Sequence, residues 1–154
     1  MPWAVAGTAG TVDIVFYGTS TRGDPNSFPS WLNSRQAATG VKWFTYFVQV
    51  QGATGTPTIY QVQASEHPTD YGQLCTQGLG CAVSGGDRTL ADFFSVATAA
   101  NGAAHIIIDD LTNQHHGAAL FELTQVAGPT AIGTTLTQTT LNTATGVTDP
   151  AGDA

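Results

Sequence analysis

The feature that most constrains the fold of this chain is an internal repeat in its strand pattern. Residues 4–20, AVAGTA-GTVDIVFYGTS, align with residues 95–112, SVATAANGAAHIIIDDLT, so that Gly10 falls over Gly102. Asn101-Gly102 lies between two apolar runs, which is the strongest short signal of a β-hairpin. Self-similarity over such a distance predicts two copies of one supersecondary unit.

The repeat continues beyond the hairpins. The segment FVQVQG (47–52) aligns with LTQVAG (123–128), and a Pro-Thr pair follows each of them within a few residues, at Pro57 and Pro129. The segment TLADFFSVATAA comes nearest to a helical pattern, but it lacks helical caps and leads directly into the Asn-Gly turn. We therefore expect strands throughout.

Each copy is predicted to contain four strands, rich in β-branched and aromatic residues with period-2 alternation. The first copy would place them at residues 3–6, 12–17, 43–50 and 58–63, and the second at 93–99, 104–109, 118–125 and 134–137. Two four-stranded antiparallel units are typical of the blades of a β-propeller. The sequence therefore predicts an all-β fold with two propeller blades, and a β-sandwich is the alternative.

The predicted organisation is one two-blade unit over residues 1–137, followed by a flexible Thr-rich tail over 138–154. Blade one would cover residues 3–63, a rim loop 64–92, and blade two 93–137. Two blades cannot close a ring, and they would leave apolar faces and sheet edges open. We expect closure by self-association, with a homotrimer giving six blades, and a dimer or tetramer as the other closed forms.

Charge restricts the partners. Only 10% of the residues are charged, the net charge is −7, and Lys42 is the only lysine. Such a surface repels polyanions, so neither nucleic acid nor an anionic membrane is expected as a partner, whereas cations, glycans and small neutral substrates stay open. No apolar run reaches the roughly 20 residues of a membrane span. No signal peptide is recognised, so the sequence leaves the location of this chain open.

The two cysteines, Cys75 and Cys81, lie in the glycine-rich segment CTQGLGCAVSGGDR. Their spacing and the low lysine content favour a small disulfide ring and an extracytoplasmic origin. Free thiols, or two zinc ligands with His67 as a third, are the alternatives; no clear fourth ligand is present.

Candidate functional residues gather in three segments that would open on one face of the propeller. These rim segments, residues 18–41, 64–92 and 110–117, hold three of the four basic residues and three of the four histidines. The hairpins on the opposite face of the propeller are small and hold no candidate functional residue. We therefore expect one functional rim.

A metal site is expected near the symmetry axis, because one aspartate per chain becomes a ring of three carboxylates in a trimer. Converging carboxylates repel one another and recruit a cation. Asp87, Asp92 and Asp109 are the candidate ligands, and their oxygen donors suit calcium. If a histidine joins them, zinc or manganese becomes possible.

The reaction expected at such a site is hydrolysis of a neutral ester: a phosphotriester, a lactone or an aryl ester. This expectation rests on analogy with other propellers that hold a central metal. His67 or His115 would act as general base and Arg88 would contact the oxyanion. The alternatives are purely structural roles. Asp109 and Asp110 would then only bind loop amides, and the pair of Asp87 and Arg88 would only order its loop.

Several segments resemble the sialidase-like (BNR-repeat-type) propeller proteins of bacteria. The segments, which together span residues 3–128, are GTVDIVFYGTS, DPN, WFTYFVQVQ, EHPTDYGQLCTQGLGC, SGGDRTLADFFSVATAANG and DDLTNQHHGA. The resemblance implies a six-bladed, secreted parent protein, of which this chain would be about a third.

The resemblance transfers the sialidase activity itself only in part. Catalytic members bind a carboxylate with three arginines and use a Tyr-Glu pair and an acidic Asp. This chain has only Arg22, Arg35 and Arg88, and it has no S-x-D-x-G-x-T-W motif. A sialidase-type glycosidase therefore stands as an alternative, beside a non-catalytic glycan-binding propeller fragment with stacking surfaces at Trp31, Trp43 and Tyr71.

Overall fold

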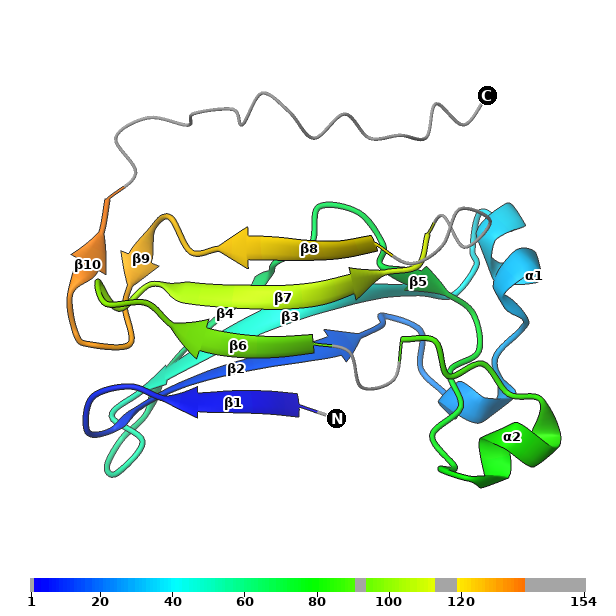
Figure 1. Ribbon diagram of the computed structural model, residues 1–154, viewed down its shortest axis with the longest axis horizontal. Coiled ribbons are helices and arrows are strands. Elements are labelled where there is room, and N and C mark those ends of the chain that lie inside the picture. Colours follow the sequence, from blue (N-terminus) through cyan, green and yellow to red (C-terminus); the bar gives the residue numbers. More distant parts are fainter. Residues whose placement is uncertain (1, 91–93, 113–118, 138–154) are drawn as a thin grey trace.

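The computed structural model describes residues 2–90, 94–112 and 119–137 (Figure 1). The strands are β1 (Pro2–Ala6), β2 (Thr11–Gly18), β3 (Lys42–Gln51), β4 (Thr58–Gln63), β5 (Asp70–Tyr71), β6 (Phe94–Thr98), β7 (Ala104–Asp110), β8 (Ala119–Thr124), β9 (Gly128–Pro129) and β10 (Thr135–Leu136). The helices are a 3-10 turn η1 (Pro25–Ser27), α1 (Trp31–Gln36) and α2 (Gly80–Ser84). All strand pairs are antiparallel, so the predicted all-β class is confirmed.

The first sheet has the order β1-β2-β3-β4, and β5 pairs with the start of β3. Along β2 and β3 the buried residues alternate with less buried ones, as expected for strands with one face in a core. Val15 and Phe47 point into the core from these two strands, and so do the polar residues Asp13 and Gln49.

The second sheet has the order β6-β7-β8. Its inner face carries the apolar side chains of Phe94, Val96, Ala104, Ile106 and Ile108, which form one buried cluster with Val15 and Phe47 of the first sheet. The two sheets therefore pack face to face, with β6 against β1 and β2. Two neighbouring propeller blades and a β-sandwich share this arrangement.

The two long hairpins have loops of equal length, but their first strands differ by one residue from the sequence alignment, since Thr98 and not Ala97 is the counterpart of Ala6. Ala6 pairs with Val12 in the β1–β2 hairpin, and Thr98 pairs with Ala104 in the β6–β7 hairpin. Gly10 and Gly102 take equivalent turn positions with φ of 85° and 81°, a region that disfavours residues with a Cβ.

The third strands differ from the sequence alignment by one residue. Gln49 lies opposite Asp13 in the first sheet, and Thr124 lies opposite His105 in the second. Thr124 is therefore the structural counterpart of Gln49, whereas the sequence alignment makes Gln125 its counterpart. A shift of one residue reverses the face of a strand. Leu123, opposite Ile106, packs against the core, so the second sheet buries the face opposite to the one that the first sheet buries.

The predicted fourth strand of the second unit, residues 134–137, does not join the second sheet. β10 pairs with β9 instead, so the second sheet has three strands within the described residues. The tight turn after β9 explains the difference: Thr130 N donates to Thr134 O at 2.8 Å, the two hydroxyls are 2.7 Å apart, and Gly133 has a φ of 79°. Local turn chemistry thus selects the nearer partner strand.

The β9–β10 hairpin is held against the tips of both long hairpins. Thr8 N donates to Ala131 O at 2.8 Å, and Ala131 N donates to Gly102 O at 3.0 Å. Gly7 lies so close that a Cβ on it would stand 2.0 Å from Ala131 O. This end of the molecule is closed by backbone contacts that need glycine.

The opposite end holds the rim segments, with α1, α2 and β5 (right in Figure 1). These segments pack around Trp43 of β3 in a second buried cluster, to which they contribute Val41, Leu74, Leu90 and Leu111. Their convergence, expected from the sequence, is borne out for the described residues by Leu111 N donating to Thr69 O at 2.9 Å. None of the helices described here has the length and apolar character needed to cross a membrane.

Candidate functional site

Acidic side chains converge where the interior of the two sheets meets the rim. Asp70 lies on β5, and Asp109 and Asp110 end β7; their residues are 0%, 6% and 6% exposed. Tyr17, near the end of β2, lies among them, and its hydroxyl oxygen accepts the backbone N–H of Asp109 at 3.1 Å. We call these four residues the acidic cluster.

Burial changes the acid chemistry of Asp70. It raises the pKa of this carboxyl to about 7, and the charges of Asp87 and Asp109 raise it further, against the lowering effects of the Tyr71 amide and the Trp31 side chain. Tyr71 N donates to Asp70 Oδ1 at 2.7 Å. Asp70 can therefore hold a proton near neutral pH, although solvent does not reach it directly.

Tyr17 and Asp109 are perturbed in the same direction. Burial raises the pKa of Tyr17 well above its ordinary value, with further contributions from the three carboxylates around it. Burial, followed by repulsion from Asp110, raises the pKa of Asp109. Asp109 Oδ1 is buried and has no hydrogen-bond partner among the described residues. The site thus favours protonated side chains or a compensating positive charge.

His67 supplies the exposed member of the site. Its Nε2 lies 2.5 Å from Asp110 Oδ2, and the exposed fractions of the two side chains are 59% and 7%. The second carboxylate oxygen of Asp110 accepts from Thr112 N at 2.9 Å and from Thr112 Oγ1 at 2.6 Å. The carboxylate is therefore fixed by its own turn and in turn orients the imidazole.

This pair can act as a general base. When Nε2–H donates to Asp110, the other ring nitrogen, Nδ1, carries the lone pair that accepts a proton. The carboxylate stabilises the imidazolium that results. Of the two histidines that the sequence suggested as base, only His67 lies within the described residues; His115 falls outside them.

The oxyanion candidate Arg88 and one metal candidate, Asp87, lie on the loop that follows α2. Asp87 Oδ1 accepts from Thr89 N and Thr89 Oγ1 at 2.9 and 2.6 Å, the same turn that Asp110 forms with Thr112. Arg88 donates through its guanidinium to Gly78 O at 2.9 Å. In this arrangement both residues order the loop.

The described part of the chain does not bring the predicted calcium ligands together. Among residues 2–90, 94–112 and 119–137, no group of three or more His, Cys, Asp or Glu side chains is placed to hold a metal ion. Asp92 lies outside these ranges, and Asp87 and Asp109 do not form such a group in their part of the chain. Calcium binding therefore stays a prediction that involves other copies of the chain.

The two cysteines form the expected disulfide, with Cα atoms 5.8 Å apart. Both are buried, and a Cβ on Gly86 would stand 2.7 Å from the Cβ of Cys75. Cys75 N also donates to Asp87 O at 2.6 Å. The disulfide thus braces the loop that carries Asp87 and Arg88.

The three expected stacking residues have different environments. Trp31 and Tyr71 are half-buried and meet edge to face with ring centroids 6.0 Å apart. The guanidinium carbon of Arg35 lies 5.1 Å from the centroid of the Trp31 ring. Trp43 is only 5% exposed and its Nε1–H donates to Gly72 O at 2.8 Å, so it is a core residue rather than a sugar-stacking surface.

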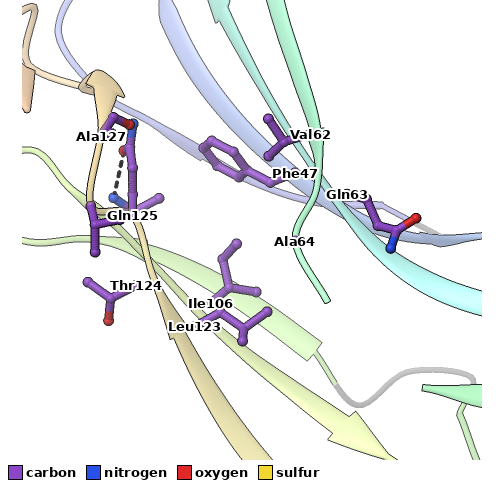
Figure 2. A pocket seen from close by; sticks show the side chains of 11 residues that line it. Phe47, Val62, Gln63, Ala64, Ile106, Leu123, Thr124, Gln125 and Ala127 are labelled. Carbon is purple, nitrogen blue, oxygen red and sulfur yellow. Dashed lines mark hydrogen bonds between the residues drawn. The ribbon is translucent and has the colours of Figure 1, made fainter. Parts of the chain in front are cut away.

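An apolar cleft of about 280 Å³ separates β4 from the end of β8. Figure 2 shows Val62 and Phe47 on one side of it and Ile106 and Leu123 on the other. Gln63, Gln125 and Thr124 supply polar groups at its border. This cleft was not predicted from the sequence, because it lies where no described strand covers the outer edge of β8.

Sequence reasoning also missed the roles of Asp70 and Tyr17 in the site. The sequence predicts Tyr17 at the end of a strand and Asp70 in the rim loop beside His67, and the proximity of the two residues depends on β5 pairing with β3. Asp110 carried a usable signal: an Asp two residues before a Thr at a strand end predicts a side-chain turn that fixes the carboxylate.

No protein-family model matches this sequence, and neither the curated proteins nor the solved structures contain a significant match to it.

Proposed function

We propose that the chain is a hydrolase of neutral esters whose general base is His67. The observation that carries the proposal is the 2.5 Å contact between His67 Nε2 and Asp110 Oδ2, which joins an exposed imidazole to a buried, fixed carboxylate. The substrate class comprises phosphotriesters, lactones and aryl esters. A neutral substrate also suits a chain with a net charge of −7.

In the proposed reaction, His67 Nδ1 takes a proton from a water molecule as the water oxygen attacks the carbonyl carbon or the phosphorus. The ester bond then breaks, and the leaving oxygen receives that proton from the imidazolium. Asp110 holds the ring orientation and stabilises its positive charge in between. Arg88 would contact the developing oxyanion through its guanidinium group.

The proposal includes a closed six-bladed propeller formed by three copies, in line with the resemblance to sialidase-like proteins. Support comes from β4, in which all six residues are exposed, with Ile59 at 62% and Val62 at 54%. Calcium, held by Asp87, Asp92 and Asp109 from several copies, would polarise the substrate oxygen. Light scattering tests closure, and a mass of 15.9 kDa, that of a single chain, would contradict it.

The activity test measures hydrolysis of activated esters, lactones and phosphotriesters by the purified chain and two variants. We expect His67→Asn and Asp110→Asn to lower kcat by at least about 100-fold, the usual contribution of a general base. His105→Asn is the matched control, because His105 forms the same kind of pair with Glu122 at 2.5 Å on the surface of the second sheet.

The outcomes separate the parts of the proposal. Equal activity of His67→Asn and His105→Asn would refute the role of His67. Loss of turnover on chelation, with recovery on adding Ca²⁺, Zn²⁺ or Mn²⁺, identifies the metal, whereas unchanged turnover refutes the metal component alone.

A glycan-binding module is the second candidate, favoured by the Trp31–Tyr71 pair and by Arg35 beside it. Aromatic rings next to polar groups suit the faces of sugars. Saturable binding of an oligosaccharide that Trp31→Ala abolishes, without any turnover of esters, would support this candidate. Turnover of a sialoside in the same panel would instead support the sialidase-type glycosidase.

A further inference from the structure

The outer face of the first sheet, the face that points away from the second sheet, is apolar. On β2 and β3 it carries the half-buried side chains of Val12, Ile14, Phe16, Tyr46, Val48 and Val50. None of these residues belongs to a buried cluster or packs against one. Among β1 to β4 the only charged residue on this face is Lys42, at the end of β3. A continuous apolar face of this kind marks an interaction surface.

The internal repeat indicates which surface fits this face. The loops of the two long hairpins have equal length, so Ile14 on β2 is the structural counterpart of Ile106 on β7. Phe16 is likewise the counterpart of Ile108. Ile106 and Ile108 are 4% and 3% exposed and lie in the core between the two sheets. The outer face of the first sheet therefore corresponds to the face that the second sheet buries.

The outer face of the second sheet has the converse relationship. Its residue Ile107 is the counterpart of Val15, which points into the core from β2. Val15 is 0% exposed, whereas Ile107 is 40% exposed, and Leu120 on the same face is 73% exposed. Each copy of the chain thus has two free faces, and they are the counterparts of the two faces that pack together inside it.

We propose that the outer face of the first sheet binds the outer face of the second sheet of another copy of this chain. The contact repeats, between copies, the sheet-on-sheet contact that joins the two sheets within one copy. Because two different faces meet, the contact is head-to-tail, and each copy binds two neighbours. This proposal rests on the closed assembly proposed above and names the surfaces through which that assembly forms.

The size of the face suits a stable contact. Four strands about 4.8 Å apart, with five to ten residues that each rise about 3.4 Å, give a face of about 20 Å by about 25 Å. Burying such a face on both partners removes about 1,000 Å² from water, the area expected of a specific interface. The outer face of the first sheet has no carboxylate, so two chains with a net charge of −7 repel each other least there.

The polar pair on the outer face of the second sheet is compatible with burial. His105 Nδ1 lies 2.5 Å from Glu122 Oε1, so each of the two groups has a partner. The buried face of the first sheet holds such a pair too, in which Gln49 donates to Asp13, the counterpart of His105. His105→Asn would keep a donor for Glu122, so the contact does not require the imidazole.

Light scattering on the full chain and on lysine variants tests the proposal. Val48→Lys places a charge on the outer face of the first sheet, and we expect the mass to fall from three times 15.9 kDa to 15.9 kDa. Ile59→Lys, on the same face and 62% exposed, should give the same loss without a risk to the fold. Val62→Lys is the matched control, because Val62 is 54% exposed on the opposite face of β4, and this variant should keep the assembled mass.

Ile107→Lys tests the partner face, and we expect it to give single chains as well. An equimolar mixture of Val48→Lys and Ile107→Lys should form a species of twice 15.9 kDa, because each variant retains one intact face. A contact between two identical faces predicts a different result, in which Ile107→Lys alone stays assembled. That result would overturn the proposal, and so would a mixture that forms no new species.

The outcomes also separate this proposal from the proposed function. Assembly that persists in both Val48→Lys and Ile59→Lys would overturn the proposed surface and leave the closed propeller standing. A mass of 15.9 kDa for the unsubstituted chain would overturn both. Absence of ester hydrolysis from an assembly that these variants dissociate would refute the hydrolase and support the surface.

Discussion

The side-chain amide of Gln49 on β3 donates to Oδ1 of Asp13 on the neighbouring strand β2 at 2.8 Å. Both residues lie on the buried face of the first sheet, where they are 1% and 0% exposed. Asp13 Oδ2 has no hydrogen-bond partner in the described part of the chain. Burial raises the pKa of Asp13, whereas the bond from Gln49 lowers it, so Gln49 stabilises the carboxylate form. A buried carboxylate in an apolar core thus depends on one amide.

Gln49→Met keeps the shape of this side chain and removes the donor. We expect it to lower the free energy of unfolding by about 1–3 kcal/mol, the cost of leaving a buried polar group unsatisfied. The loss should be larger at pH 8 than at pH 4, because the bond from Gln49 stabilises the ionised form of Asp13 more than the protonated form. Urea unfolding measures both values. Gln51→Met is the control, since Gln51 only donates to Gln49 from a half-buried position; an equal loss in this variant would contradict the assignment.

The raised pKa of Asp70 predicts an unusual dependence of stability on pH. Its pKa is about 7 in the folded chain against 3.8 for an ordinary Asp, so between these values the folded state binds a proton that the unfolded chain has lost. The stability that this difference contributes is complete below pH 3.8 and is lost as the pH rises to 7. Its size is on the order of 4 kcal/mol.

The measurement compares urea unfolding at pH 4.5 and pH 7.5. We expect Asp70→Asn to flatten the decline between them, because an amide can still accept from Tyr71 N but cannot ionise. Asp24→Asn is the control: hydrogen bonds from Asn26 lower the pKa of Asp24, so its contribution changes only below pH 3.8. A slope in Asp70→Asn as steep as in the unsubstituted chain would refute the prediction.

Local signals explain why much of the fold was predictable. The strands of the first unit were found to within one or two residues, because alternation and the turn glycine Gly10 are properties of neighbouring residues. α2 was missed because its five residues are too short for a helical period, and it ends at Gly85, whose φ is 67°. The predicted partner strand of β10 was wrong, because β10 pairs with β9 through the tight turn between Thr130 and Thr134. This turn is not part of the internal repeat.

The candidate site was predictable only in part, for a related reason. His67 and the acidic end of β7 were both recognised, but 43 residues separate His67 from Asp110, and no periodicity connects them. Asp70 reaches the site only through the β5–β3 pairing. A site that depends on contacts between distant residues can be predicted only when the strand topology is known. The disulfide joins two cysteines only six residues apart, so it could be predicted from the sequence alone.

The disulfide should stabilise the chain by closing a short loop. For Cys75 and Cys81, six residues apart, loop entropy predicts about 2 kcal/mol. The double variant Cys75→Ser/Cys81→Ser should show this loss in urea unfolding. Reductant should lower the stability of the unsubstituted chain to the same value and leave the variant unchanged; a reductant effect of equal size on both would contradict the prediction.

Close packing at Gly7 gives the last prediction. A Cβ there would stand 2.0 Å from Ala131 O, a backbone atom held by the hydrogen bond from Thr8 N. Gly7→Ala must therefore push the β9–β10 hairpin away, and we expect a loss of about 1–3 kcal/mol in urea unfolding, as for other overpacked sites. Gly55→Ala is the matched control, because its nearest neighbour is Gly52 O at 4.0 Å. Similar stabilities of the two variants would show that the hairpin does not pack on Gly7 in solution.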